Sequence, residues 1–235
     1  MARGEDAPGV HFLHIGKTGG TSLKKMVKKH DVRRTGDGRR LVMHSHAMRL
    51  PDVLGRHRKN TAAFFLRDPV ARFVSGFNSR LREGAPIAYI PWKPAEVIAF
   101  KNFPTPNDLA EALSANRQLI QHQAFSAMSA MVHSRMHFTY WLRDIDYLES
   151  RLAKIEFIGF LETYNEDAER LVGRLELPDS VRPEHYHEAP STASKQMSDK
   201  GRANLEHWYA EDIAILRWAQ DRRDRWAPAA GQAEA

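Results

Sequence analysis

The hydrophobic positions of the chain fall into short apolar runs that alternate with stretches of helical spacing. Apolar runs of strand length occupy 10–15, 62–66 and 155–161. After each run, apolar side chains recur every three or four positions, which is typical of an amphipathic helix. Strands that alternate with helices predict an α/β fold built on a mostly parallel sheet.

The remaining segments predict further helices and one long loop. The helices are expected at 47–59, 107–115, 118–132, 146–154 and from near Ser198 toward Trp226. Residues 84–106 are rich in proline and aromatic side chains and lack a regular period, so we expect a loop that either shapes a substrate site or packs on the surface.

Two local features of the predicted helices can be checked against a structure. Thr163 to Glu166 has the pattern of a capping box, which would open the helix after the third apolar run. Trp208 and Tyr209 share one face of the last predicted helix, and we expect them to pack that helix onto the sheet.

Length and composition indicate one domain. The chain has 235 residues, enough for one α/β domain, which we place at 10–226, with a disordered N-terminus at 1–9 and a flexible tail at 227–235. No apolar run approaches bilayer length, so neither a signal peptide nor a membrane anchor is expected. The absence of cysteine excludes disulfides, thiolate zinc sites and a cysteine nucleophile, and favours a cytoplasmic location.

The charge balance points to anionic ligands. The formal net charge is +6, and 35 lysines and arginines are spread along the chain. This balance favours a phosphorylated nucleotide, an anionic glycan or lipid, or nucleic acid, although an ordinary basic surface would have the same composition. No aromatic-interleaved nucleic-acid motif is visible, so we expect no nucleic-acid partner.

A glycine-bearing turn follows the first apolar run and has the features of a phosphate cradle. Its residues are Gly16, Lys17, Thr18, Gly19, Gly20, Thr21 and Ser22. The glycines let backbone amides crowd around an anion, and the helix that follows directs its N-terminus at the turn. The common triphosphate loop has a hydroxyl directly after its lysine to hold magnesium, and that seat is not evident here. A plain glycine turn with an exposed lysine is the alternative.

Two more segments carry polar side chains to the edge of the predicted sheet at which the glycine turn lies. Residues 41–46 read as an extended run, in which His44 and His46 would share one face. Arg67 follows the second apolar run, and Asp68 and Pro69 mark the start of the next helix. Arg67 therefore lies at the carboxyl end of a strand, where open α/β sheets bind ligands.

These motifs resemble those of carbohydrate sulfotransferases. Residues 12–22, Phe-Leu-His-Ile-Gly-Lys-Thr-Gly-Gly-Thr-Ser, are similar to the family's 5′-phosphosulfate loop, usually written H-I-P-K-T-G-G-T-S, with Gly16 in place of the proline. Residues 66–77 resemble its 3′-phosphate motif, R-D-P-x-x-R-x-x-S. Heparan-sulfate 2-O-sulfotransferase-like members carry a similar His-x-His between the two. The resemblance covers most of the chain except roughly 84–143.

The resemblance implies a fold and an activity. The fold would be a three-layer, P-loop-NTPase-like sulfotransferase fold with helices on both sides of a central sheet. The activity would be transfer of a sulfuryl group from 3′-phosphoadenosine 5′-phosphosulfate (PAPS) to a hydroxyl of a carbohydrate, lipid or small molecule, without a metal. The basic chain suits an anionic acceptor. The oligomeric state is open.

The same resemblance implies roles for individual residues. Lys17 and the amides of residues 16–22 would hold the 5′-phosphosulfate, Arg67 and Ser75 the 3′-phosphate, and Lys195 would lie in a loop that closes over the nucleotide. Arg72 would contact a phosphate or the acceptor, or be a solvated arginine. His44 is our choice of base, with His46 as its support or substitute, because a neutral imidazole accepts a proton near pH 7.

Other interpretations stay open at this point. The histidine pair could be buried and merely hydrogen-bonded, or could form a metal site with His185 and His187. A kinase-like phosphotransferase that uses ATP would need magnesium, which distinguishes it from a sulfotransferase. A polyanion-binding protein without activity would explain the charge but not the three local motifs.

Overall fold

The computed structural model describes residues 8–86, 88–178, 180–181 and 196–226. The chain divides into two compact units, each built from segments that are distant in sequence. The sheet unit comprises Met1–Arg67, Phe138–His187 and Ala214–Ala235, and the helical unit comprises Asp68–His137 and Glu188–Ile213. One domain over 10–226 stays a prediction. Residues 1–7 and 227–235, predicted to be disordered or flexible, lie outside the described residues.

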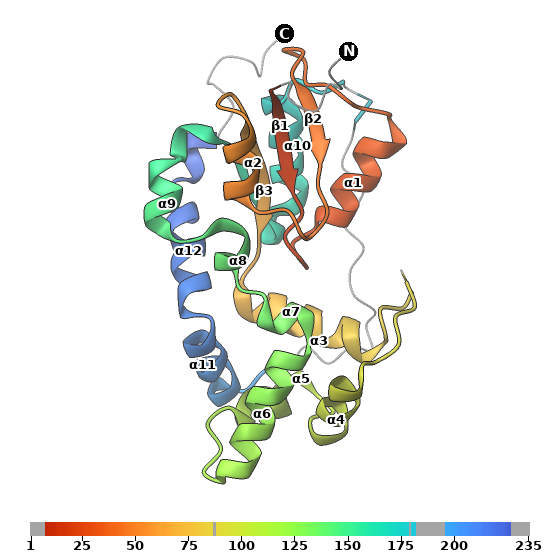
Figure 1. Ribbon diagram of the computed structural model, residues 1–235, viewed down its shortest axis with the longest axis vertical. Helices are drawn as coiled ribbons and strands as arrows, with labels where there is room; N and C mark the ends of the chain where they lie inside the picture. Colours follow the sequence, from red (N-terminus) through yellow and green to blue (C-terminus); the bar gives the residue numbers. More distant parts are fainter. Residues whose placement is uncertain (1–7, 87, 179, 182–195, 227–235) are drawn as a thin grey trace. The chain divides into compact units, whose positions relative to one another are not determined.

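In the part of the chain that the structure describes, the sheet unit contains a four-stranded parallel sheet (Figure 1). Its strands are β1 (Gly9–Leu13), β2 (Arg40–Met43), β3 (Thr61–Leu66) and β4 (Ile155–Phe160), in the spatial order β2-β1-β3-β4. Because all four strands are parallel, their carboxyl ends meet at one edge of the sheet. The predicted α/β class with a mostly parallel sheet is confirmed.

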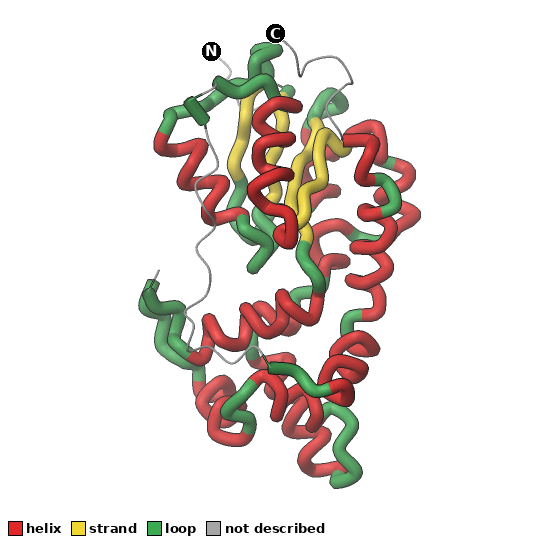
Figure 2. Tube along the Cα trace, turned by 180° about the vertical axis from the view of Figure 1, so that it is seen from behind, coloured by secondary structure: helices red, strands yellow, loops and turns green. Residues whose placement is uncertain are grey.

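Helices flank this sheet. The α-helices of the sheet unit are α1 (Gly20–Lys29), α2 (Leu50–Arg56), α8 (Phe138–Leu142), α9 (Ile145–Ser150) and α10 (Tyr164–Arg174). The helix α10 lies over one face of the sheet (Figure 2), and α2 lies over the other (Figure 1). Among the described residues, no helix is both long enough and apolar enough to cross a membrane.

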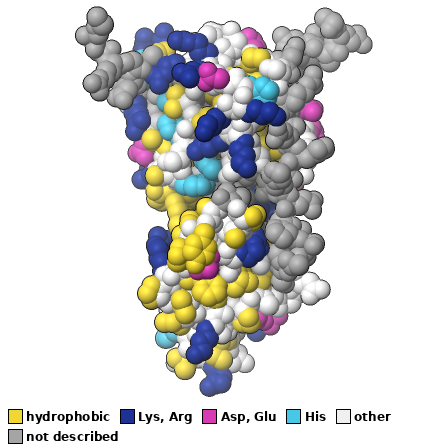
Figure 3. Space-filling model, turned by 90° about the vertical axis from the view of Figure 1, so that its right-hand side faces the viewer, with side chains coloured by type: hydrophobic (Ala, Val, Ile, Leu, Met, Phe, Trp, Pro, Cys, Tyr) yellow, Lys and Arg dark blue, Asp and Glu magenta, His cyan; other side chains and the backbone are white. Residues whose placement is uncertain are grey.

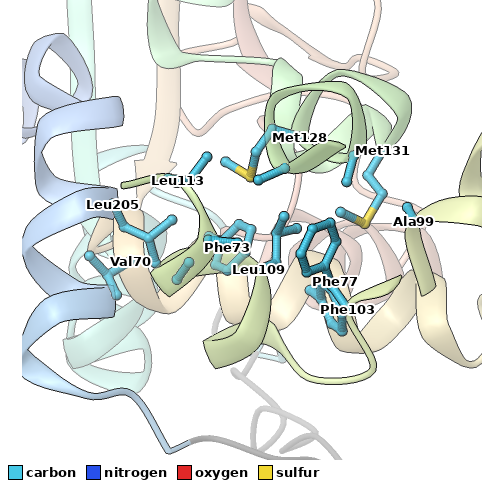
Figure 4. Packing of buried hydrophobic residues seen from close by; sticks show 14 of the residues in the cluster. Val70, Phe73, Phe77, Ala99, Phe103, Leu109, Leu113, Met128, Met131 and Leu205 are labelled. Atoms are coloured by element: carbon cyan, nitrogen blue, oxygen red, sulfur yellow. The ribbon is translucent and has the colours of Figure 1, made fainter. Parts of the chain in front are cut away.

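The helical unit packs around its own apolar core. Its helices are α3 (Pro69–Leu81), α4 (Pro94–Asn102), α5 (Pro106–Ala112), α6 (Gln118–Ala130), α7 (Val132–Arg135), α11 (Asp199–Trp208) and the first residues of α12 (Ala210–Gln220). Phe73 and Phe77 project from α3 into a buried cluster with Met128 and Leu205 (Figure 4). The predicted α3 boundary is confirmed, since the Asp68 side chain accepts a hydrogen bond from the Ala71 amide at 2.7 Å.

The expected long loop is wrong in its second half, because α4 lies within it. Glu96 stabilises the start of this helix by accepting a hydrogen bond from the Lys93 amide at 2.9 Å. Ala99 and Phe100 are buried on the inner side, while Val97 and Ile98 are exposed on the outer side. A helix that is apolar on opposite sides has no amphipathic period, which is why its pattern was missed.

The last predicted helix is in fact two helices, α11 and α12, interrupted at Tyr209. Tyr209 is fully buried in the core of the helical unit, 6.5 Å from Phe73 between ring centroids, and its hydroxyl donates to the Ser134 carbonyl oxygen at 2.8 Å. Trp208 packs against the same cluster. The expectation that these aromatics hold a helix onto the sheet is therefore wrong.

The predicted capping box at the start of α10 is also wrong. A 3-10 turn, Leu161–Thr163, precedes the helix, and the Thr163 side chain makes no capping hydrogen bond. Its hydroxyl instead donates to Asp167 Oδ2 at 2.7 Å, and the same carboxylate oxygen accepts from the Phe160 amide at 2.8 Å. Asp167 therefore stabilises the end of β4 and the first turn of α10 together.

Candidate active site

The turn between β1 and α1 is compact and held by its own hydrogen bonds. Lys17 and Gly19 have φ angles of 68° and 88°, in the left-handed region. The buried Thr18 hydroxyl donates to the Ile15 carbonyl oxygen at 3.0 Å, and the Ser22 amide donates to the Gly19 carbonyl oxygen at 3.0 Å. Left-handed residues that alternate with ordinary ones just before a helix N-terminus turn the backbone amides toward a common point. Such a concave set of amides is suited to an anion.

Gly19 and Gly20 are needed because neighbouring side chains occupy the space of a Cβ atom. At Gly19 a Cβ would lie 2.9 Å from Leu161 Cδ1, and the positive φ adds strain for any other residue. At Gly20 it would lie 2.2 Å from His14 Cδ2. The turn is thus packed against the residue that follows β1 and against the start of α10.

Arg67 lies beside this turn. It follows β3 directly, is half-buried, and its guanidinium donates a long hydrogen bond of 3.4 Å to the Lys17 carbonyl oxygen. The structure therefore brings together two of the predicted donor-binding segments. Ser75 lies on α3 in the helical unit, so its pairing with Arg67 stays a prediction.

His46 lies at the same edge of the sheet and is exposed. Its Nδ1 atom is 2.9 Å from the His14 carbonyl oxygen, and the two imidazole rings are in contact, with centroids 3.8 Å apart and planes tilted by 38°. The buried Trp141 indole donates to the His46 carbonyl oxygen at 2.7 Å. Side-chain and backbone contacts therefore both hold His46 in place.

His44 has a different environment from His46. It is buried, and its Nε2 atom lies 2.8 Å from His11 Nδ1, with the ring planes 7° apart. The strand β2 ends at Met43, so the expectation that His44 and His46 share a strand face is wrong. Each of the two contacts its own histidine from the β1 segment.

Burial disfavours the charged form of the buried histidines. Burial, with smaller contributions from the nearby His46 and Lys24, lowers the pKa of His14 to about 3. Burial, with a smaller contribution from His11, lowers the pKa of His44 to about 4. The Lys24 side chain is half-buried, which lowers its pKa as well. His14 and His44 are consequently neutral at pH 7.

Residues 4–219 match the sulfotransferase family. The chain belongs to this family. No curated protein shows a significant match to it. The match spans both units, and it agrees with the parallel sheet, the flanking helices and the turn between β1 and α1. A more specific likeness to heparan-sulfate 2-O-sulfotransferases stays a prediction.

Two residues of this sulfotransferase's site were not singled out from its sequence. His11 lies within β1, and His14 lies between β1 and the glycine turn. The sequence signal that could have identified them is their position three residues apart, in an apolar strand segment directly before the glycine turn. What the sequence does not contain is their pairing with His44 and His46, which depends on the parallel register of β1 and β2.

Arg72 is neither solvated nor placed to bind a ligand. It is fully buried in the helical unit, where its guanidinium donates to the Met136 carbonyl oxygen at 2.6 Å and lies 3.7 Å from Asp212 Oδ2. Asp212 also lies 3.6 Å from His137 Nδ1. In this sulfotransferase Arg72 stabilises the packing of α3 against the segments that follow α7 and α11.

Three predicted site residues cannot be placed. Lys195, His185 and His187 lie outside the described residues. Within 8–86, 88–178, 180–181 and 196–226, no group of three or more histidine, aspartate or glutamate side chains is arranged to hold a metal ion.

Proposed function

We propose that this chain transfers a sulfuryl group from PAPS to a hydroxyl group of a carbohydrate, lipid or small-molecule acceptor. The observation that carries the proposal is the hydrogen bond from Arg67 to the Lys17 carbonyl, beside the glycine turn and at the sheet edge that bears His46. The turn would take the 5′-phosphosulfate, and Arg67 the 3′-phosphate. The acceptor class and a cytoplasmic location remain predictions.

The residues of the turn fit an anionic donor. The left-handed backbone at Lys17 and Gly19 and the N-terminus of α1 supply amide donors for an anion. PAPS supplies the sulfuryl group and an aligned phosphate leaving group. The Lys17 ammonium would counter the charge that develops on the leaving oxygen, and the planar guanidinium of Arg67 suits a phosphate.

For the base, the contacts favour His46 over His44. The His14 carbonyl can only accept, so His46 Nδ1 donates, and the lone pair of the neutral ring is on Nε2. His46 is also exposed, so an acceptor hydroxyl can reach it. His44 Nε2 is engaged with His11, and its ring is buried. We therefore propose that His46 takes the acceptor's proton and that His44 supports the site.

Binding of the donor product tests this proposal. We would titrate the full chain with 3′-phosphoadenosine 5′-phosphate (PAP) and, separately, with ADP by calorimetry in EDTA. PAP should bind more tightly than ADP. Arg67→Ala should weaken PAP binding by about tenfold or more, because it removes a charged hydrogen-bonding partner. Arg58→Ala is the matched control, since it removes an exposed arginine before β3 and should leave binding unchanged.

Two outcomes would reject the proposal. Preferential binding of ATP or ADP that requires magnesium would favour a kinase-like phosphotransferase. Equal and salt-sensitive binding of PAP, ADP and unrelated polyanions, unaffected by Arg67→Ala, would favour a polyanion-binding protein without activity.

A further inference from the structure

The helical unit exposes large apolar side chains that belong to neither of the predicted phosphate motifs. Four large apolar side chains on α4 and the segment before it are exposed: Tyr89 by 71%, Ile90 by 55%, Val97 by 47% and Ile98 by 62%. We call these four residues the α4 patch. Figure 3 shows hydrophobic side chains gathered over this unit, with lysine and arginine side chains and a few acidic ones among them.

The outer face of α4 has the composition of a buried surface. A surface helix normally presents polar residues to solvent and apolar ones to the core. In α4 the core side is filled by Ala99 and Phe100, yet Val97 and Ile98 continue the apolar surface outward. A groove of about 330 Å³ adjoins Ile98, between α4 and α6. Among the described residues, nothing covers Val97 or Ile98.

The exposed charges at the ends of α4 are positive. Lys93 and Lys101 are exposed at the two ends of α4. Between Gly84 and Phe103 the sequence has one acidic residue, Glu96. Its carboxylate is 3% exposed and accepts hydrogen bonds from Arg80 Nε and Nη2, both at 2.7 Å. The carboxylate is thus withdrawn from the surface and neutralised, while both lysines stay in solvent.

The nearest carboxylate before the patch is also engaged. Glu83 is half-buried, and its Oε1 atom accepts a hydrogen bond from the Trp92 amide at 3.1 Å. The Trp92 indole donates to the Arg80 carbonyl oxygen at 2.7 Å. These contacts hold the segment that carries Tyr89 and Ile90 against α3, so the patch is a fixed surface with a net positive rim.

We propose that the α4 patch docks the protein onto a bilayer that contains anionic phospholipid. Exposed aliphatic side chains next to lysines match the boundary between headgroups and acyl chains, and a tyrosine prefers the same depth. Each lysine near an anionic surface contributes about 1 kcal/mol, which corresponds to roughly fivefold in binding. This inference does not depend on the proposed sulfuryl transfer.

Vesicle flotation tests the proposal with the full chain and no nucleotide present. Vesicles of phosphatidylcholine alone would be compared with vesicles of equal parts phosphatidylcholine and phosphatidylglycerol. The wild-type chain should float with the anionic vesicles only. Val97→Ser with Ile98→Ser should reduce binding by about tenfold or more, and Lys101→Gln by about fivefold.

A charge-matched control separates the patch from the overall positive charge. Lys28→Gln changes the net charge equally at an exposed position of α1 and should alter binding less than about twofold. Equal losses in Lys28→Gln and Lys101→Gln, or anionic binding that survives the loss of Val97 and Ile98, would overturn the proposal. So would a dimer in light scattering that the double variant dissociates, because a second copy would then cover the patch.

Discussion

His46 Nδ1 lies 2.9 Å from the main-chain carbonyl oxygen of His14, and the centroids of the two tilted rings are 3.8 Å apart. One backbone carbonyl thereby sets the tautomer of His46 and places the lone pair of the neutral ring on Nε2. The His14 ring also fills the space beside Gly20 in the glycine turn. His14 thus connects the predicted donor loop with the proposed base.

The two histidines should differ in their effect on turnover. We expect His46→Asn to reduce sulfuryl transfer by about 10²- to 10⁴-fold, the range for loss of a general base, with PAP affinity unchanged. His44→Asn should retain most of the activity. The assay is labelled-sulfate transfer from PAPS to a panel of glycans, lipids and phenols, with PAP calorimetry on each variant. Loss of transfer in His44→Asn alone would assign the base to His44 instead.

Gly20→Ala should damage the donor site. Its Cβ would lie 2.2 Å from His14 Cδ2, so the ring must move. We expect a loss of about 1–3 kcal/mol in the free energy of unfolding and PAP binding weaker by about tenfold or more. The control is Gly55→Ala on α2, where a Cβ meets nothing within 4 Å, so the unfolding free energy should stay constant or rise by up to about 1 kcal/mol.

Stability should fall as pH is lowered below the ordinary histidine pKa of 6.5. In the folded chain the pKa of His14 is about 3 and that of His44 about 4. Between those values and 6.5 the unfolded chain binds protons that the folded chain does not, so stability rises with pH. From about pH 7 to pH 5 we expect a loss of roughly 1–2 kcal/mol for each histidine.

Guanidinium unfolding at the two pH values measures this effect. His44→Leu should reduce the difference between the two pH values, because it removes one buried group that must stay neutral. The exposed His207→Asn serves as the control and should leave the difference as in the wild type. An unfolding free energy that is equal at both pH values would contradict the burial argument.

Removal of the Glu96 carboxylate should destabilise the helical unit. Glu96→Ala leaves the Arg80 guanidinium, whose side chain is 8% exposed, without its ion-pair partner. Breaking such a buried pair typically lowers stability by about 3–5 kcal/mol. Glu206→Ala, which removes an exposed pair with Arg202 at 4.0 Å, should change stability by no more than about 0.5 kcal/mol. Thermal unfolding of both variants distinguishes an ion pair that stabilises the fold from one that contributes little to stability.

Local patterns in the sequence predicted the parts of the fold that neighbouring residues encode. The predictions of the strands before Lys17 and Arg67 and of the helix start at Asp68 and Pro69 were all correct. Hydrophobic periodicity, helix capping and proline geometry each depend only on residues that are close in sequence. The pattern failed at α4, which is apolar inside and out, and at Tyr209, where packing in the helical core interrupts a continuous helical period.

The sequence by itself determined the α/β class, the glycine turn after the first strand and the sulfotransferase family. Only the tertiary structure decided which histidines meet, because the contacts of His11 with His44 and of His14 with His46 cross from β1 to the segment after β2 and depend on strand register. The same holds for Arg72, which belongs to a family motif in sequence yet is fully buried beside Asp212. Local motifs depend on residues that are neighbours in sequence, whereas the burial and pairing of side chains arise only when distant segments pack together.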